Sequence, residues 1–262
     1  MGKMMKVVNI HTDENRDFRF EEAIKTLRTN IQFSGPGIKT VMFTSAVPGE
    51  GKSQITVSEA ISLAGLGRKV LVVDADIRKS VLLTRYQVEQ EVHGLSEYLS
   101  GQRQLEEVIC ATDIQGLDII FAGPYSPNPS ELLAEPLFKE LIQKKRDEYD
   151  YILIDTPPMA GITDAAIIST VCDGAVLVIA AGTVSRRIER RVKEQLEKSG
   201  CRILGAVLNK VTAEHGGYYG KAYRKYYGYD TEKSPGRQNG RTAQGETGLS
   251  YHSLFFISLN LL

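Results

Sequence analysis

Apolar and polar residues follow two patterns along this chain: short apolar runs, and longer segments in which apolar residues recur every three or four positions. The apolar runs predict strands at residues 40–44, 69–73, 117–121, 151–155, 175–180 and 203–208. Segments with helical spacing fall between most of these runs, so strands and helices alternate. This alternation predicts an α/β fold with a mainly parallel sheet and helices on both of its faces.

The ends of several predicted helices can be read from single residues. The first helix, 18–33, is followed by Ser34-Gly35-Pro36-Gly37, a sequence that stops helices. Ser130 is expected to cap a long helix over 131–146. The other predicted helices are 54–64, 94–99, 105–110 and 185–198.

The length of 262 residues suits one such domain with appendages. We expect a loosely ordered polar arm over 1–16, a domain over 17–212 whose first helix covers 17–33, a tyrosine-rich tail over 213–230, and a disordered extension over 231–262. The end of that extension, 249–262, is unexpectedly apolar, and we assign it no role.

Composition excludes some classes of protein. Lys plus Arg and Asp plus Glu both number 32, so the overall charge does not indicate a nucleic-acid partner. The three cysteines are scattered, which argues against a disulfide framework and is typical of a reducing cytosol. We find no signal-peptide pattern and no apolar run of about 20 residues, so we expect a soluble cytoplasmic protein.

The sequence Ala46-Val47-Pro48-Gly49-Glu50-Gly51-Lys52-Ser53 follows the first strand and leads into a helix. It fits the phosphate-binding loop pattern with Ala46 in place of the first glycine; the alternative is an ordinary glycine-rich turn. In such a loop, backbone N–H groups converge on phosphate oxygens, the lysine contacts the β- and γ-phosphates, and the serine hydroxyl ligates Mg²⁺. The expected nucleotide-binding residues are Pro48, Gly49, Glu50, Gly51, Lys52, Ser53 and Gln54.

Acidic residues stand at the ends of two other predicted strands. Asp74 and Asp76 follow the strand 69–73, and Asp155 ends the strand 151–155. Open α/β sheets bind ligands at this edge, and carboxylates there suit Mg²⁺ binding or proton acceptance. The alternative is that Asp74 and Asp76 cap a helix. Asn209 follows the last predicted strand. An asparagine at this position either contacts a nucleotide base or forms a turn.

Two helices carry charged stripes. Glu22, Lys25 and Arg28 are three residues apart, so they lie on one side of the helix 18–33. The helix 185–198 carries a basic group: Arg186, Arg187, Arg190, Arg191 and Lys193. Each stripe is either a solvated face or a contact surface. As a contact surface, the basic stripe on 185–198 would suit an acidic protein or anionic lipid.

Residues 216–229 hold six of the twelve tyrosines of the chain. They are Tyr218, Tyr219, Tyr223, Tyr226, Tyr227 and Tyr229. Interspersed glycines keep neither a helical nor a strand period, so we expect an exposed, flexible segment. Such phenols can stack on bases or sugars, form a linker, or accept phosphate, and an attached ATP-binding domain favours phosphate acceptance.

The chain resembles the bacterial protein-tyrosine kinases of capsule and exopolysaccharide assembly, of the Firmicute type with a separate cytoplasmic kinase chain. Four motifs carry the resemblance, which runs from about Phe18 to Asp230: residues 46–53, 70–78 (V-L-V-V-D-A-D-I-R), 152–158 (I-L-I-D-T-P-P) and the tyrosine cluster. The resemblance implies a kinase that uses ATP and Mg²⁺. It implies that Lys52 and Ser53 bind phosphate and metal, that Asp74 accepts the tyrosine proton, and that Asp76 and Asp155 complete the metal site.

The resemblance also implies partners. In the family, the tail tyrosines of one subunit are phosphorylated in the active site of a neighbour within a ring-shaped homo-oligomer. The E-x-x-R-x-x-R motif of its oligomerisation helix corresponds to Glu22, Lys25 and Arg28, with lysine in place of the first arginine. Other expected partners are a membrane-spanning chain-length regulator that activates the kinase and holds it at the inner face of the membrane, a tyrosine phosphatase, and protein substrates in sugar-nucleotide and polysaccharide synthesis.

Two other functions are weighed against this one. Positioning ATPases of the septum-site or plasmid-partition type share the fold, but they carry an extra lysine early in the phosphate loop, where this chain has Val47. A non-catalytic, nucleotide-dependent scaffold would not need all three carboxylates.

Overall fold

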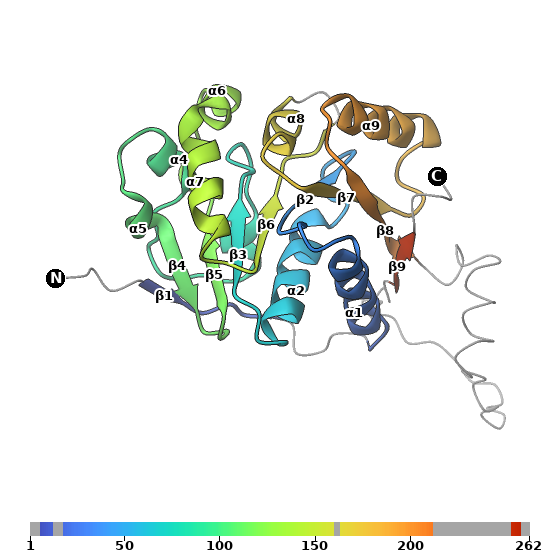
Figure 1. The fold of residues 1–262 in the computed structure, drawn as a ribbon, viewed down its shortest axis with the longest axis horizontal. Helices are drawn as coiled ribbons and strands as arrows, with labels where there is room; N and C mark the ends of the chain where they lie inside the picture. Colours follow the sequence, from blue (N-terminus) through green and yellow to red (C-terminus); the bar gives the residue numbers. More distant parts are fainter. Residues whose placement is uncertain (1–5, 13–17, 160–162, 212–252, 258–262) are drawn as a thin grey trace, which may run out of the picture.

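The computed structural model describes residues 6–12, 18–159, 163–211 and 253–257. Its centre is a nine-stranded sheet in the order β1-β4-β5-β3-β6-β2-β7-β8-β9 (Figure 1). The strands are β1 Lys6–Val8, β2 Thr40–Ser45, β3 Val70–Asp74, β4 Ile109–Thr112, β5 Leu117–Ile120, β6 Tyr151–Asp155, β7 Gly174–Ala180, β8 Ile203–Val211 and β9 Ser253–Ile257. Neighbouring strands are parallel except for the pairs β4–β5 and β8–β9. The predicted α/β fold is confirmed.

Helices cover both faces of the sheet (Figure 1). They are α1 Phe18–Phe33, α2 Lys52–Ala64, α3 Leu82–Arg85, α4 Leu95–Leu99, α5 Leu105–Val108, α6 Pro129–Ala134, α7 Pro136–Arg146, α8 Asp164–Ser169 and α9 Arg186–Lys198. One apolar core joins the sheet to α1, α2 and α3, and the other joins it to α4 through α9. None of the described helices is both long and apolar enough to cross a membrane.

The central strands are buried on both faces, as their continuous apolar sequences predict. In β3, Val70 and Val72 pack in the core with α1 and α2, whereas Leu71 and Val73 pack in the core on the other face. Because successive side chains of a strand point to opposite faces, a strand between two helical layers needs an apolar residue at every position. The six strands read from the sequence are all present, with ends shifted by a few residues at most.

Several elements differ from the sequence-based expectations. Lys6–Val8 is a strand inside the segment 1–16, which was expected to be a loose arm; it pairs with β4. The helix expected over 105–110 stops at Val108, and the chain continues directly into β4. Both strands have three or four residues, too few to establish a period in the sequence.

The long helix expected over 131–146 is two helices, α6 and α7. Glu135 between them has extended backbone angles, φ −63° and ψ 145°, and Pro136 begins α7. A residue before proline is disfavoured in the helical conformation, and proline cannot donate to the preceding turn. Pro136 therefore marks a helix boundary that was not predicted from the sequence.

The end of the chain differs as well. Ser253–Ile257 forms β9 antiparallel to β8, within the segment 231–262 for which no ordered element was expected. The tyrosine cluster, and the rest of 212–252, lie outside the described residues.

Candidate active site

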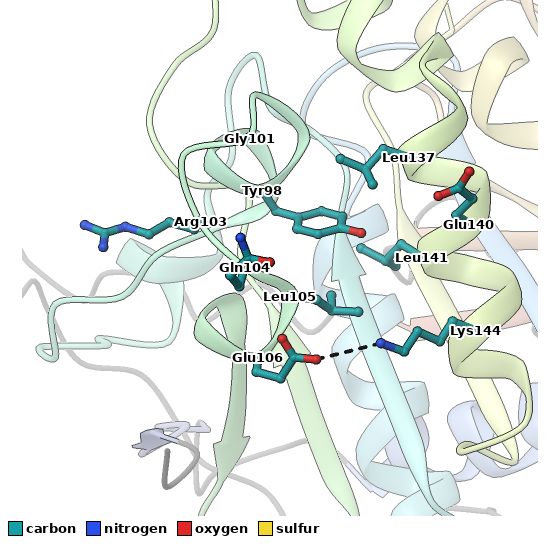
Figure 2. A pocket seen from close by; sticks show the side chains of 10 residues that line it. All are labelled: Tyr98, Gly101, Arg103, Gln104, Leu105, Glu106, Leu137, Glu140, Leu141 and Lys144. Atoms are coloured by element: carbon teal, nitrogen blue, oxygen red, sulfur yellow. Dashed lines mark ion pairs between the residues drawn. The ribbon is translucent and has the colours of Figure 1, made fainter. Parts of the chain in front are cut away.

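A hollow of about 370 Å³ lies beside α7, lined by Tyr98, Leu105, Leu137 and Leu141 among others (Figure 2). Glu106 and Lys144 form an ion pair there, with 3.7 Å between Oε1 and Nζ. Neither the phosphate loop nor a strand-end carboxylate lines this hollow. The predicted chemistry lies elsewhere in the molecule.

The candidate site lies at the carboxyl ends of three neighbouring parallel strands, β3, β6 and β2. β2 leads into the phosphate loop, 46–53, while β3 and β6 end in Asp74 and Asp155. These two carboxylate residues are register partners across β3 and β6. Parallel strands end at the same edge of a sheet, which is why residues far apart in sequence meet here.

The phosphate loop is held in shape by the Glu50 side chain. Glu50 is fully buried, and its two carboxylate oxygens accept hydrogen bonds from the backbone N–H groups of Val47 (2.9 Å) and Ala180 (3.0 Å). Glu50 therefore ties the loop to itself and to the end of β7. Glu50 was expected to contact the nucleotide, and this orientation of its side chain was not predicted.

The end of β8 holds the loop from the other side. The Asn209 side-chain amide donates to the Glu50 carbonyl (2.8 Å), and Lys210 Nζ donates to the Gly49 carbonyl (2.6 Å). The Asn209 Oδ1 atom accepts from the Lys210 N–H (2.8 Å), so both ends of this amide are engaged. These bonds give Asn209 a supporting role in the loop. A side-chain amide has a second N–H and a second oxygen lone pair, so base reading by Asn209 stays a prediction.

The remaining residues of the predicted nucleotide set lie around this framework. Pro48 and Gly49 are exposed at the outer turn of the loop, and Gly51 precedes α2. Gln54 is half-buried in the first turn of α2, where its Oε1 accepts from the Arg85 guanidinium at 3.4 Å.

Gly51 permits the close approach of Asn209 to the loop. Gly51 has φ +96°, and a Cβ atom at this position would lie 2.1 Å from the Asn209 side-chain nitrogen. Gly49 has φ +83°, but a Cβ there would meet no atom within 4 Å. Alanine in place of Gly49 would therefore meet backbone strain alone, whereas alanine in place of Gly51 would meet both backbone strain and a steric clash.

We predict that Gly51→Ala destabilises the nucleotide-free chain far more than Gly49→Ala does. A left-handed backbone angle costs alanine about 1–2 kcal/mol at either position. Gly51→Ala must in addition displace Asn209 and break its bond to Glu50, which adds about 1–3 kcal/mol. Urea unfolding of both variants measures the difference, and equal losses of stability would contradict the role given to Asn209.

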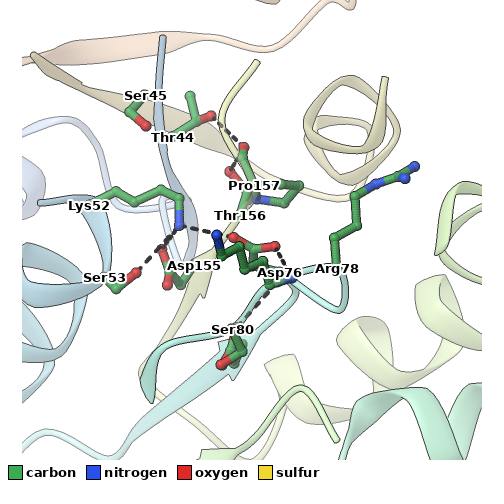
Figure 3. Close-up of polar contacts among 12 residues, drawn as sticks. Thr44, Ser45, Lys52, Ser53, Asp76, Arg78, Ser80, Asp155, Thr156 and Pro157 are labelled. Atoms are coloured by element: carbon green, nitrogen blue, oxygen red, sulfur yellow. Dashed lines mark hydrogen bonds and ion pairs between the residues drawn. The ribbon is translucent and has the colours of Figure 1, made fainter. Parts of the chain in front are cut away.

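Lys52 lies among the strand-end carboxylates (Figure 3). Its Nζ atom is 3.3 Å from Asp76 Oδ2, 3.5 Å from Asp155 Oδ1 and 3.3 Å from Ser53 Oγ. Asp74 is fully buried next to them; it accepts from the Asp76 N–H (3.2 Å) and from the Ser80 hydroxyl. The structure thus brings together Lys52, Ser53 and all three carboxylates singled out from the sequence.

The cluster has an excess of negative charge in a buried place. Burial, together with the charge of Asp155, raises the pKa of Asp74 above its ordinary range, and burial likewise raises the pKa of Asp155. Burial would lower the pKa of Lys52, but the carboxylates of Asp155, Asp76 and Asp74 outweigh it and raise that pKa. One ammonium group cannot balance three ionised carboxylates, so the cluster favours either a proton on Asp74 or a further cation. A bound cation would lower the pKa of Asp74 and leave its carboxylate able to accept a proton.

The residues present suit Mg²⁺ bound together with phosphates. Asp155 Oδ1 is buried and accepts no hydrogen bond from the described residues, and its contact with Lys52 is an ion pair at 3.5 Å. The described residues include no group of three or more His, Cys, Asp or Glu placed to hold a metal unaided. Mg²⁺ usually takes one or two carboxylates and completes its shell with phosphate oxygens and water, so such a group is not required.

Two residues of the site were missed in the sequence. Arg78 Nε donates to Asp164 Oδ2 (2.5 Å), and its Nη2 donates to Ser130 Oγ (2.9 Å), which fixes the loop after β3 to α8 and α6. Ser80 donates to Asp74. The only signal for Arg78 was its place in the motif 70–78, and nothing in the sequence marked Asp164 as its partner.

The first charged stripe does not act as one unit. Lys25 and Glu22 form an exposed ion pair of 2.7 Å on α1. Arg28 turns toward α2, where its Nη1 donates to the backbone oxygen and the hydroxyl of Ser62. On α9, the second stripe is exposed at Arg186, Arg187, Arg190 and Arg191, with Lys193 half-buried.

Comparison with known proteins bears on the chemistry of this site. Residues 38–187 match the family model of an AAA domain. The tyrosine-protein kinase CpsD of Streptococcus agalactiae is 44% identical over 210 residues, which cover 78% of this chain and 92% of that protein.

Solved structures similar to this chain include a kinase domain and a septum-site protein. The kinase domain of the Escherichia coli tyrosine kinase ETK is 33% identical with a TM-score of 0.69, covering 76% of this chain and 81% of that structure. The septum site-determining protein MinD of Pyrococcus horikoshii, solved with Mg-ADP, is 28% identical with a TM-score of 0.56, covering 64% and 69%. The similarity is higher to the kinases than to the septum-site protein.

Proposed function

We propose that this chain, which belongs to the bacterial tyrosine-protein kinases, transfers the γ-phosphoryl group of Mg·ATP to the tyrosines of its own C-terminal cluster, residues 218–229. The observation that carries the proposal is the gathering of Asp74, Asp76 and Asp155 around Lys52 and Ser53. Such a site combines a phosphate-binding cation with acids that hold Mg²⁺ or accept a proton.

Residues of the loop would hold the nucleotide. Lys52 and the backbone N–H groups of 48–54 would contact the phosphates, at the N-terminus of α2. Ser53, Asp76 and Asp155 would hold Mg²⁺, which when bound neutralises charge on the phosphates. The Lys52 ammonium then leaves its carboxylate partners for the phosphate oxygens.

Asp74 would accept the proton of the acceptor tyrosine. It makes no ion pair of 4.0 Å or less with a described lysine or arginine, unlike Asp76 and Asp155, which pair with Lys52. The hydrogen bonds from Ser80 and the Asp76 N–H fix its orientation. A phenol has an ordinary pKa of about 10, so a nearby base promotes attack by its oxygen.

A positioning ATPase is the second candidate. The similarity in fold to the septum-site protein supports it. Val47 stands where those proteins carry their additional lysine, and the tyrosine cluster has no use in such an ATPase. Both observations favour the kinase.

Assembly and partners follow from the same proposal. The chain would assemble into a ring-shaped homo-oligomer in which the tail of one subunit enters the active site of the next. The contact surface would include Glu22, Lys25 and Arg28. The exposure of the Glu22–Lys25 pair supports this surface, whereas Arg28 contacts its own chain. A membrane-spanning chain-length regulator would activate the kinase at the inner membrane face. The process served would be capsule or exopolysaccharide synthesis and export, with protein substrates in sugar-nucleotide and polysaccharide synthesis and a phosphatase to reverse the modification.

Intact-mass spectrometry tests the proposed acceptors. The full chain is incubated with Mg·ATP and the cytoplasmic segment of its regulator, beside a variant with phenylalanine at all six tail tyrosines. We expect stepwise addition of phosphate to the wild type within 218–229 and none to the variant. The variant should bind ATP as the wild type does, because phenylalanine removes only the accepting hydroxyl groups.

A wild-type chain that gains phosphate elsewhere, with the six-phenylalanine variant labelled equally, would contradict the tail as acceptor. A wild-type chain that consumes ATP but gains no phosphate would favour the positioning ATPase.

A further inference from the structure

A hollow of about 270 Å³ adjoins the carboxylate cluster at Asp76. Its lining includes Asp76, Lys79 and Ser80, the last of which donates to Asp74. No residue of the phosphate loop lines it. In Figure 3, Lys52 approaches Asp76 from one side, while Arg78 and Ser80 lie on other sides. Asp76 thus contacts Lys52 and also lines this hollow.

The outer walls of the hollow are apolar and exposed. Leu83 on α3 is 36% exposed, and Tyr125, between β5 and α6, is 73% exposed. Ala122 and Gly123 complete this side of the wall. Large apolar side chains gathered at a rim beside a charged site mark a surface that binds something apolar.

We propose that this hollow receives the phenol ring of the acceptor tyrosine, with Leu83 and Tyr125 determining the specificity for an aromatic acceptor. The inference rests on the proposed kinase function and names the part of the site that recognises the second substrate. An aromatic ring between Leu83 and Tyr125 would point its hydroxyl inward, toward Ser80 and the carboxylates behind it. Rings packed edge-to-face or offset add favourable contact beyond burial alone.

The transfer is then a single displacement. The phenol oxygen forms a bond to the γ-phosphorus as the bond from that phosphorus to the β–γ bridging oxygen breaks. ADP leaves with that oxygen, and the phenol proton passes to the Asp74 carboxylate. The phosphates would lie on the Lys52 side and the phenol on the Ser80 side, so attacking and leaving oxygens lie on opposite sides of the phosphorus.

The test separates acceptor binding from nucleotide binding. The full chain, with Mg·ATP and the regulator segment, is given a peptide of residues 216–229, and kcat/KM is measured for peptide and for ATP. The variants are Leu83→Ala, Tyr125→Ala and the double variant. We expect the double variant to lose about tenfold or more in kcat/KM for the peptide, with the KM for ATP and the Tm unchanged.

A variant outside the hollow serves as the control. Leu66→Ala removes an apolar side chain of similar exposure, 51%, in the turn after α2, and it should have no effect.

The outcomes are distinguishable. If wild type and double variant phosphorylate the peptide, and their own tails, at equal rates, the hollow is not the acceptor site and the kinase function stands. If the wild type phosphorylates neither peptide nor tail, both the proposed function and this inference are wrong. A rise in the KM for ATP with no change in the KM for the peptide would assign the hollow to the nucleotide and overturn the proposal.

Discussion

Lys52→Met is expected to abolish phosphoryl transfer and to destabilise the folded chain at the same time. Lys52 supplies the positive charge within 3.5 Å of both Asp76 and Asp155, and all three side chains are buried. Removing one partner of a buried ion pair costs about 3–5 kcal/mol, since the remaining charges stay unpaired. Loss of a preorganised group that stabilises developing charge lowers the rate by about a hundred- to a thousandfold.

Urea unfolding and phosphotyrosine formation measure the two effects separately. Lys52→Arg keeps the charge but changes its geometry, so it should recover most of the stability and little of the activity. The double variant Lys52→Met/Asp155→Asn should also recover stability, since it removes one of the carboxylates left without a partner. A fully stable Lys52→Met chain would contradict the charge balance that we assign to this cluster.

Asp74→Asn is expected to lose much of its activity as well, but with little change in stability. The amide has nearly the shape of the carboxylate and can still accept a hydrogen bond, but it cannot take up the proton of a phenol. General-base catalysis contributes about a hundred- to ten-thousandfold to a rate, and we expect a loss in that range. Burial raises the pKa of Asp74, which means that the folded state disfavours its charged form, so a neutral residue should be tolerated.

The measurement is the rate of tail phosphorylation beside the affinity for ATP. Asp74→Asn should bind ATP with near wild-type affinity, whereas Lys52→Met should not. Ser80→Ala removes a hydrogen-bond donor to Asp74 but leaves the carboxylate in place, so we expect it to lose much less activity than Asp74→Asn. An Asp74→Asn chain that phosphorylates tyrosine at the wild-type rate would exclude Asp74 as the proton acceptor.

The sheet was predictable because each central strand contains an unbroken apolar run, with polar residues only near its ends. β3 and β6 each contribute side chains to both apolar cores, so each appears in the sequence as an unbroken apolar run. The two runs end at the site residues Asp74 and Asp155. The rule that parallel strands end at one edge then places these residues beside the phosphate loop. For the same reason, the candidate carboxylates could be listed before their distances were known.

Contacts between distant parts of the chain were not predictable. The Glu50 carboxylate bonds the N–H of Ala180, and Arg78 pairs with Asp164; neither pairing leaves a periodic trace in the sequence. Short elements were lost for a related reason, since β1 and β4 have too few residues to show a period. Glu50 also shows that a motif position can be identified correctly while the direction of its side chain is missed.

The fate of the γ-phosphate distinguishes a tyrosine kinase from a positioning ATPase. The full chain is incubated with γ-labelled ATP, Mg²⁺ and the regulator segment, and label is counted in phosphotyrosine and in free phosphate, for wild type and Asp74→Asn. We expect most of the wild-type label in phosphotyrosine within residues 218–229, and we expect this signal to disappear in the variant. Label found only in free phosphate, at equal rates in both chains, would contradict the proposed kinase activity.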